Sequence, residues 1–138
     1  MLGERKHIRL LIVNEEEAYC NLVKEHIKLN DYCYDIECQC VPSGEAAVKA
    51  ISNWGPNMVL LDMFISDMNG FDLLKYCNGT QTPVVVTSEE HLDQIEREVL
   101  EVGAADYFKA DDDPDNMDYL LEKVVELATS DQTPFWYQ

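Results

Sequence analysis

The sequence is poor in basic residues, and this shortage excludes several classes of partner. Of its 138 residues, 10 are Lys or Arg and 27 are Asp or Glu, which gives a formal net charge of -17 at pH 7. Such a charge repels nucleic-acid phosphates and anionic lipid head groups. We therefore expect no direct binding to nucleic acid and no attachment to membrane.

Long apolar runs and paired cysteine motifs are also missing. No apolar stretch approaches the ~20 residues of a membrane span, and the polar residues 1–7 do not look like an export signal. The cysteines contain no C-x-x-C pair, which disfavours a zinc site and favours reduced, buried thiols. They are Cys20, Cys33, Cys38, Cys40 and Cys77. These features predict a cytoplasmic protein.

The chain does contain a regular alternation of strand-like and helix-like segments. Hydrophobic residues make up 46% of it, a globular composition. The expected strands are residues 7–13, 33–41, 58–62, 83–87 and 105–109, and the expected helices are 16–29, 43–54, 71–77, 89–100 and 115–128. Strict alternation predicts a mostly parallel sheet covered on both faces. We expect one doubly wound α/β domain over 1–138, with its core at about 7–128.

One expected strand differs from the others. Residues 33–41 alternate, with Ile36, Cys38 and Cys40 on one face and acidic or amide side chains on the other. This pattern is typical of a strand with one wetter face, so we place it at an edge of the sheet.

Acidic side chains follow two of the apolar strands. Asp62 comes directly after residues 58–61, and Asn14-Glu15-Glu16-Glu17 comes directly after residues 10–13. A nucleotide site here would need a Gly-rich loop after the first strand, which is missing. Clustered carboxylates suit a hard divalent cation such as Mg2+. The sequence therefore disfavours a flavin- or nucleotide-binding enzyme and indicates a metal site.

These segments resemble the response-regulator receiver domain of two-component signal transduction, of the chemotaxis-regulator kind. Residues 11–16 resemble its first strand and acidic pair, and Leu60-Leu61-Asp62 with Gly70 eight residues later resembles its phosphoacceptor strand and loop. Val86-Thr87-Ser88 resembles its fourth strand, and residues 103–107 resemble its switch segment. The resemblance implies a flavodoxin-like (βα)5 fold with strand order 2-1-3-4-5.

By this resemblance, Asp62 is the phosphoacceptor and the site binds Mg2+. Glu15 and Asp62 would hold the cation, with Asn14 contributing through a water molecule and Phe64 through its backbone carbonyl. The phosphoryl donor would be a histidine kinase or a phosphotransfer protein. Catalysis in such a site is mainly positioning and charge neutralisation, and we expect no enzyme activity of any other kind.

The resemblance also implies how the signal leaves the domain. Thr87 would bond a phosphoryl oxygen, and Tyr107 would follow it inward as the switch residue. The face made by residues 89–128 would then bind a downstream protein, and it is also the face through which a dimer would form.

Several positions depart from the family pattern. Asn14 is neutral where the family has an acid, and Ser66 replaces the loop proline. The position of the family's lysine is Ala110, and Lys109 lies one residue early as a displaced cation. Side chains alternate across a strand, so this slip sends Lys109 to the other face unless the strand bulges. We expect weak Mg2+ binding and impaired phosphotransfer.

Two functions therefore compete. The first is a receiver that accepts a phosphoryl group on Asp62. The second is a pseudo-receiver, a protein-interaction module that works without phosphorylation. The aromatic residues 133–138 could dock on the domain, contact a partner or fray, and the sequence does not choose among these.

Overall fold

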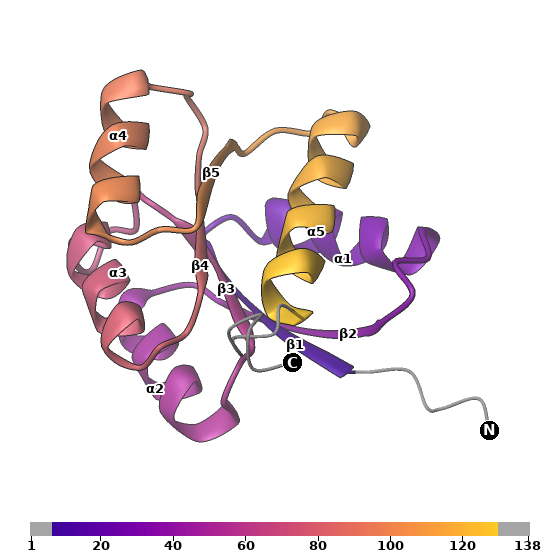
Figure 1. Ribbon diagram of the computed structural model, residues 1–138, viewed down its shortest axis with the longest axis horizontal. Helices are drawn as coiled ribbons and strands as arrows, with labels where there is room; N and C mark the ends of the chain where they lie inside the picture. Colours follow the sequence, from indigo (N-terminus) through magenta and orange to yellow (C-terminus); the bar gives the residue numbers. More distant parts are fainter. Residues whose placement is uncertain (1–6, 130–138) are drawn as a thin grey trace, which may run out of the picture.

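The computed structural model describes residues 7–129, which form five strands alternating with five helices (Figure 1). The aromatic segment 133–138 lies outside the described residues. The strands are β1 His7–Val13, β2 Asp35–Val41, β3 Met58–Asp62, β4 Val84–Ser88 and β5 Asp106–Lys109. The helices are α1 Glu17–Leu29, α2 Gly44–Trp54, α3 Gly70–Gly79, α4 Asp93–Val102 and α5 Pro114–Thr129.

The strands form one parallel sheet in the order β2-β1-β3-β4-β5. This confirms the doubly wound α/β class and the 2-1-3-4-5 order. Helices α1 and α5 cover one face of the sheet and α2, α3 and α4 cover the other, as Figure 1 shows. The carboxyl ends of β1, β3 and β4 therefore meet at one edge of the three-layer sandwich.

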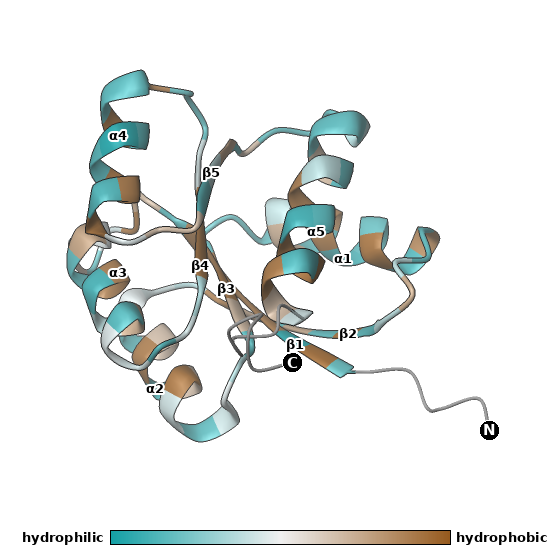
Figure 2. Cartoon of the chain, in the orientation of Figure 1, coloured by the Kyte–Doolittle hydropathy of each residue, from teal (hydrophilic) through white to brown (hydrophobic). Residues whose placement is uncertain are grey.

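The core is divided into two apolar layers by the sheet. Alternate residues of the central strands point to opposite faces, so Leu11 and Leu61 pack under α2 and α3 while Leu10 and Leu60 pack under α1 and α5. All four are buried. Figure 2 shows the hydrophobic colour concentrated on β1, β3 and β4 and the hydrophilic colour on the outer sides of the helices. Burial on both faces explains why these strands read as continuous apolar runs.

Most helices begin where the sequence indicates. Ser43 caps α2 by accepting a hydrogen bond from the Ala46 N–H at 3.1 Å. Asn69 caps α3 in the same manner, accepting from the Phe71 N–H at 2.8 Å. Pro114 occupies the first position of α5, where its missing N–H costs nothing.

Helix α4 begins later than the sequence suggests. We expected a helix over residues 89–100 that starts near Ser88-Glu89-Glu90, but the first residue of α4 is Asp93. The Ser88 hydroxyl accepts a hydrogen bond from the Glu90 N–H, and the Glu90 carbonyl accepts one from the Tyr107 hydroxyl. The carbonyl that would begin the helix is therefore bonded to β5, and residues 89–92 remain a loop.

Strand β2 lies at an edge of the sheet, as its alternating sequence predicted. All five cysteines are free thiols. Cys20 and Cys77 are buried, but Cys38 and Cys40 are half-buried and Cys33 is exposed, so the expectation of buried cysteines is wrong for Cys33. Within the described residues, no helix combines the length and apolar character that crossing a bilayer requires.

Candidate functional site: an acidic pocket at the carboxyl edge of the sheet

Asp62 is the last residue of β3 and lies at the floor of an open pocket. It pairs with Thr87 of β4 in the sheet register and is half-buried. The Phe64 N–H donates to Asp62 Oδ1 at 3.1 Å, while the Phe64 side chain points to solvent. The pocket has a volume of about 380 Å3 and is lined by Glu15, Glu16, Asp62, Phe64, Ser88, Glu89, Glu90 and Leu92.

Hydrogen bonds hold the Asn14 and Glu15 side chains in the loop after β1. Glu15 Oε1 accepts a hydrogen bond from the Ser66 N–H at 2.6 Å and another from the Ser66 hydroxyl. These bonds lower the pKa of Glu15 below its ordinary value. Asn14 is buried, and its side-chain oxygen accepts from the Glu16 N–H at 2.8 Å. The loop after β1 is thereby tied to the loop after β3.

The pocket is strongly electronegative, and this changes the titration of its carboxyls. Burial raises the pKa of Asp62, and the charges of Glu89 and Glu15 add to the effect against the opposing Phe64 hydrogen bond. Glu16 also has a raised pKa, because its carboxyl shares a hydrogen bond with Glu89 and feels that group's charge. An anion entering this pocket meets five carboxyl groups, those of Glu15, Glu16, Asp62, Glu89 and Glu90.

Replacing Asp62 with asparagine is expected to stabilise the protein at neutral pH. A carboxyl whose pKa is raised by folding favours the folded state below its unfolded pKa, and that contribution is lost as the pH rises through the folded pKa. Asn removes the charge and keeps the shape, so we expect a gain of about 1 kcal/mol. Thermal melts should show a higher Tm for Asp62→Asn at pH 7, with the difference shrinking as the pH falls.

Asp67 provides the matched control. Its oxygens accept hydrogen bonds from the N–H groups of Gly44 and Glu45 at 2.8 and 3.0 Å, which lower its pKa. A carboxyl whose pKa is lowered by folding stabilises the folded state at pH values above its pKa in the unfolded chain. This contribution is lost as the pH falls through its pKa in the folded chain. Asp67→Asn should therefore destabilise the protein and lower its Tm at pH 7. Equal effects of the two substitutions would contradict the electrostatic explanation.

The cation expected near Asp62 is present but is not in contact with it. Lys109 and Ala110 both line a second cavity of about 270 Å3 that also includes Asp62 and Glu89. Lys109 pairs with Ser88 at the end of β5 and its side chain is exposed. Among the described residues, no ion pair within 4.0 Å joins Lys109 to Asp62. The Ala110 N–H donates a hydrogen bond to the Ser88 carbonyl at 2.7 Å. The Ala110 side chain is a methyl group and supplies no charge to the cavity.

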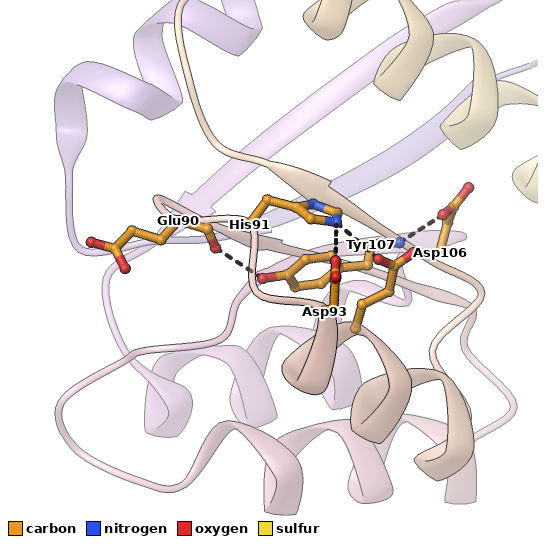
Figure 3. A network of polar contacts seen from close by, with 6 residues as sticks. Glu90, His91, Asp93, Asp106 and Tyr107 are labelled. Carbon is orange, nitrogen blue, oxygen red and sulfur yellow. Dashed lines mark hydrogen bonds and ion pairs between the residues drawn. The ribbon is translucent and has the colours of Figure 1, made fainter.

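Thr87 and Tyr107 are both buried beside the pocket. The Thr87 hydroxyl points to the β3 backbone, with its Oγ1 3.5 Å from the Leu61 carbonyl oxygen. The Tyr107 hydroxyl donates to the Glu90 carbonyl at 3.0 Å, and the ring of His91 meets the Tyr107 ring edge-on at 5.1 Å between centroids (Figure 3). His91 in turn lies 2.9 Å from Glu96 on α4. The Tyr107 side chain is thus held in a buried position by residues of the loop before α4.

The structure brings together most of the residues that the sequence singled out. Asp62, Glu15 and Asn14 share the carboxyl edge with Thr87, as the strand-end argument required. The role of Ser66 was not predicted from the sequence, where this residue stands only in place of a proline. Glu89 was not predicted either, although its position directly after Thr87-Ser88 at a strand end was the available signal.

The donor set at this edge fits a hard divalent cation. Asp62 and Glu15 supply carboxylate oxygens, and Asn14 supplies an amide oxygen. Both hydrogen bonds from Ser66 go to Glu15 Oε1, and Glu15 Oε2 takes part in neither of them. Because Asn14 Oδ1 already accepts from the Glu16 N–H, the amide is better suited to an indirect contact through water than to a direct bond.

Sequence comparison finds curated relatives among bacterial regulators. Regulatory protein AtoC of Escherichia coli (strain K12) is 26% identical over 123 residues, covering 88% of this chain and 26% of the relative. Transcriptional regulatory protein KdpE of Mycobacterium tuberculosis (strain ATCC 25618 / H37Rv) is 26% identical over 116 residues, covering 83% of this chain and 48% of the relative. The chain thus spans half or less of the length of these two relatives.

Solved structures share the fold. The BeF3-activated N-terminal receiver domain of Klebsiella pneumoniae RstA matches with a TM-score of 0.76 and 23% identity over 88% of this chain and 99% of the other. The Mn(2+)-bound form of response regulator Rcp1 matches with a TM-score of 0.72 and 20% identity, over 92% of this chain and 99% of the other.

A family model settles the assignment. The model of the response regulator receiver domain matches residues 10–122, from within β1 to within α5. The matched segment contains every strand end that lines the acidic pocket. The chain belongs to the response regulator receiver domain family.

Proposed function

We propose that this chain is a working receiver that accepts a phosphoryl group on Asp62 and signals through the face made by residues 89–128. Receiver domains interact with histidine kinases and with downstream effectors. In the proposed reaction, an Asp62 oxygen attacks the phosphorus of a phosphohistidine. The bond between phosphorus and the donor nitrogen breaks, and its electron pair returns to the imidazole.

The observation that carries the proposal is the placement of the Asp62 carboxylate. It stands at the end of a buried strand, in an open pocket, beside Glu15 and next to Thr87 in the neighbouring strand. A half-buried nucleophile with solvent on one side is accessible to a donor histidine. The raised pKa of Asp62 also makes its ionised form a stronger base and nucleophile once formed.

Mg2+ would supply the charge neutralisation that the pocket lacks. Glu15 and Asp62 would hold it, with Asn14 reached through water, and it would offset the repulsion between the carboxylates and the incoming phosphoryl group. The backbone carbonyl of Phe64 is the remaining proposed ligand. Ser66 keeps the Glu15 carboxylate turned toward the loop after β3, which is the side that Asp62 faces.

Phosphorylation is tested by intact mass. Incubation of the chain with Mg2+ and a small phosphodonor such as acetyl phosphate should add the mass of one phosphoryl group. BeF3- should shift the NMR signals of residues around Asp62 and Thr87. We expect modification at millimolar Mg2+ and over long incubation, because Asn14 weakens the cation site and Ala110 removes the usual lysine.

Asp62→Asn is the matched control, since it preserves the shape of the side chain and removes the nucleophile. It should gain no mass and show no BeF3- response. Loss of both responses in the wild-type chain as well would overturn the proposal. Mass gain that persists in Asp62→Asn would assign the phosphoryl group to another residue.

A pseudo-receiver is the second candidate, and the anchored Tyr107 favours it. Its hydroxyl donates a hydrogen bond to the Glu90 carbonyl, which ties the β4–α4 loop to β5. In that case the 89–128 face binds its partner with the same affinity in the presence and absence of phosphodonor. The absence of a BeF3- response would support this alternative.

A further inference from the structure

Two cysteines from different elements meet between α1 and β2. Cys20 lies on the inward side of α1 with 3% of its surface exposed, and Cys40 is a half-buried residue of edge strand β2. Both belong to the apolar layer under α1 and α5. Both also line the same pocket at the carboxyl edge of the sheet, so the two thiols face one shared space.

The pair is open to small molecules from one side. An open pocket of about 390 Å3 is lined by both cysteines together with Asn14, Glu15, Glu17, Asn21, Lys24, Val41 and Pro42. Lys24 lies one helical turn after Cys20, so its ammonium group shares this pocket with the Cys40 sulfur. Its charge lowers the pKa of the Cys40 thiol. A cation beside a thiol that faces a pocket is the environment of a reactive cysteine.

The two sulfurs are electronically unequal. Hydrogen bonding from Cys20, followed by the charge and hydrogen bond of Lys24, lowers the pKa of Cys40 against the effect of burial. The same thiol pair raises the pKa of Cys20. Cys40 is also the more accessible of the two, since it is half-buried while Cys20 is 3% exposed, so Cys40 is the one placed to act as the nucleophile.

We propose that Cys40 is a peroxide-reactive modification site and that Cys20 is its resolving partner. The Cys40 sulfur attacks one oxygen of hydrogen peroxide, the O–O bond breaks, and Cys40 sulfenic acid and one water form. The Cys20 sulfur then attacks the Cys40 sulfur, the S–O bond breaks, and a second water leaves. Two thiols and one peroxide yield one disulfide and two waters.

The other cysteines differ in ways that make them internal references. Cys77 is buried in the opposite apolar layer, where burial raises its pKa to about 11. Burial raises the pKa of Cys38, two residues before Cys40, to about 12. Cys33 is exposed. A reaction governed by exposure alone would select Cys33, and one governed by the pocket that Cys20, Lys24 and Cys40 share would spare it.

Thiol mapping of the 138-residue chain tests the proposal. The reduced protein is treated with about one equivalent of hydrogen peroxide, remaining thiols are alkylated, and peptides are mapped by mass spectrometry. We expect Cys20 and Cys40 to lose alkylation together, to appear as one intramolecular cross-link, and to regain alkylation after dithiothreitol. Oxidation of Cys33 with Cys20 and Cys40 still reduced would overturn the proposal.

Two variants separate the roles. Cys20→Ser should leave Cys40 as a sulfenic acid that dimedone traps, and Lys24→Met should slow cross-linking several-fold while leaving the alkylation rate of Cys33 unchanged. Dimedone labelling of Cys20 in a Cys40→Ser variant would contradict the assignment of nucleophile and resolving partner. The wild-type map depends on no substitution, so it decides the cross-link even where a variant fails to fold. The measurement uses no phosphodonor, so it is independent of whether Asp62 is phosphorylated.

Discussion

Replacing Ala110 with lysine is expected to accelerate phosphorylation of Asp62 by about 10- to 100-fold. A charge-assisted hydrogen bond to a transferring phosphoryl group contributes about 1.5–3 kcal/mol, and ~1.4 kcal/mol corresponds to a factor of ten in rate. Ala110 lines the same cavity as Asp62 and Glu89, so the new ammonium group enters a pocket of carboxylates. Initial rates of mass gain with acetyl phosphate and Mg2+ measure the effect.

Ala110→Met is the control for this substitution, because it has a similar length without charge and should leave the rate near that of the wild type. Lys109→Ala addresses the displaced cation. If the Lys109 ammonium group contacts the phosphoryl group during transfer, Lys109→Ala lowers the phosphorylation rate of the wild type. The same substitution then lowers the rate by a smaller factor in the Ala110→Lys variant. An unchanged rate in Ala110→Lys would show that a cation at this position does not limit the reaction.

Replacing Gly70 with alanine is expected to destabilise the fold by about 2–3 kcal/mol. Gly70 is the first residue of α3, and a Cβ atom there would lie 2.3 Å from the Met63 carbonyl oxygen. That neighbour is backbone, so either α3 or the loop after Asp62 must move. This loss of free energy of unfolding corresponds to a decrease in Tm of roughly 7–10 °C for a chain of this size.

Gly79, at the other end of α3, is the matched control. A Cβ atom at this position meets nothing within 4 Å. Gly79→Ala should leave the Tm unchanged or raise it slightly, since alanine has less backbone freedom to lose on folding. Because Gly70 follows the loop that carries Ser66 and Asp67, Gly70→Ala should also disturb the hydrogen bonds to Glu15. Equal Tm values for the two variants would contradict the close approach of α3 to Met63.

The elements of the fold are readable from the sequence because their periodicity is local. The buried strands are uninterrupted apolar runs, and their bounds agree with the structure to within one or two residues. The order of the strands was taken from the family resemblance, because order depends on which elements pack together in space. The late start of α4 was missed for the same reason, since a bond from Tyr107 to Glu90 links positions 17 residues apart.

The candidate site was predictable where its residues follow strand ends. Asp62, Glu15 and Thr87 all do so, and parallel strands bring their carboxyl ends to one edge. What lay beyond sequence reasoning is which partner each side chain takes. The Ser66 hydroxyl reaches Glu15 across 51 residues, and the shared hydrogen bond of Glu16 with Glu89 crosses from one loop to another. Such pairs are properties of the folded chain.

The two borders of the sheet determine how copies of this domain can approach one another. Strand β2 carries Asp35 and Glu37 on its wetter side, and β5 is a four-residue strand that begins with Asp106 and ends with Lys109. Charged side chains at both borders, together with the shortness of β5, disfavour intermolecular strand addition and fibril growth. Association at high concentration should therefore proceed through helices and loops, and strand-to-strand aggregation should be suppressed.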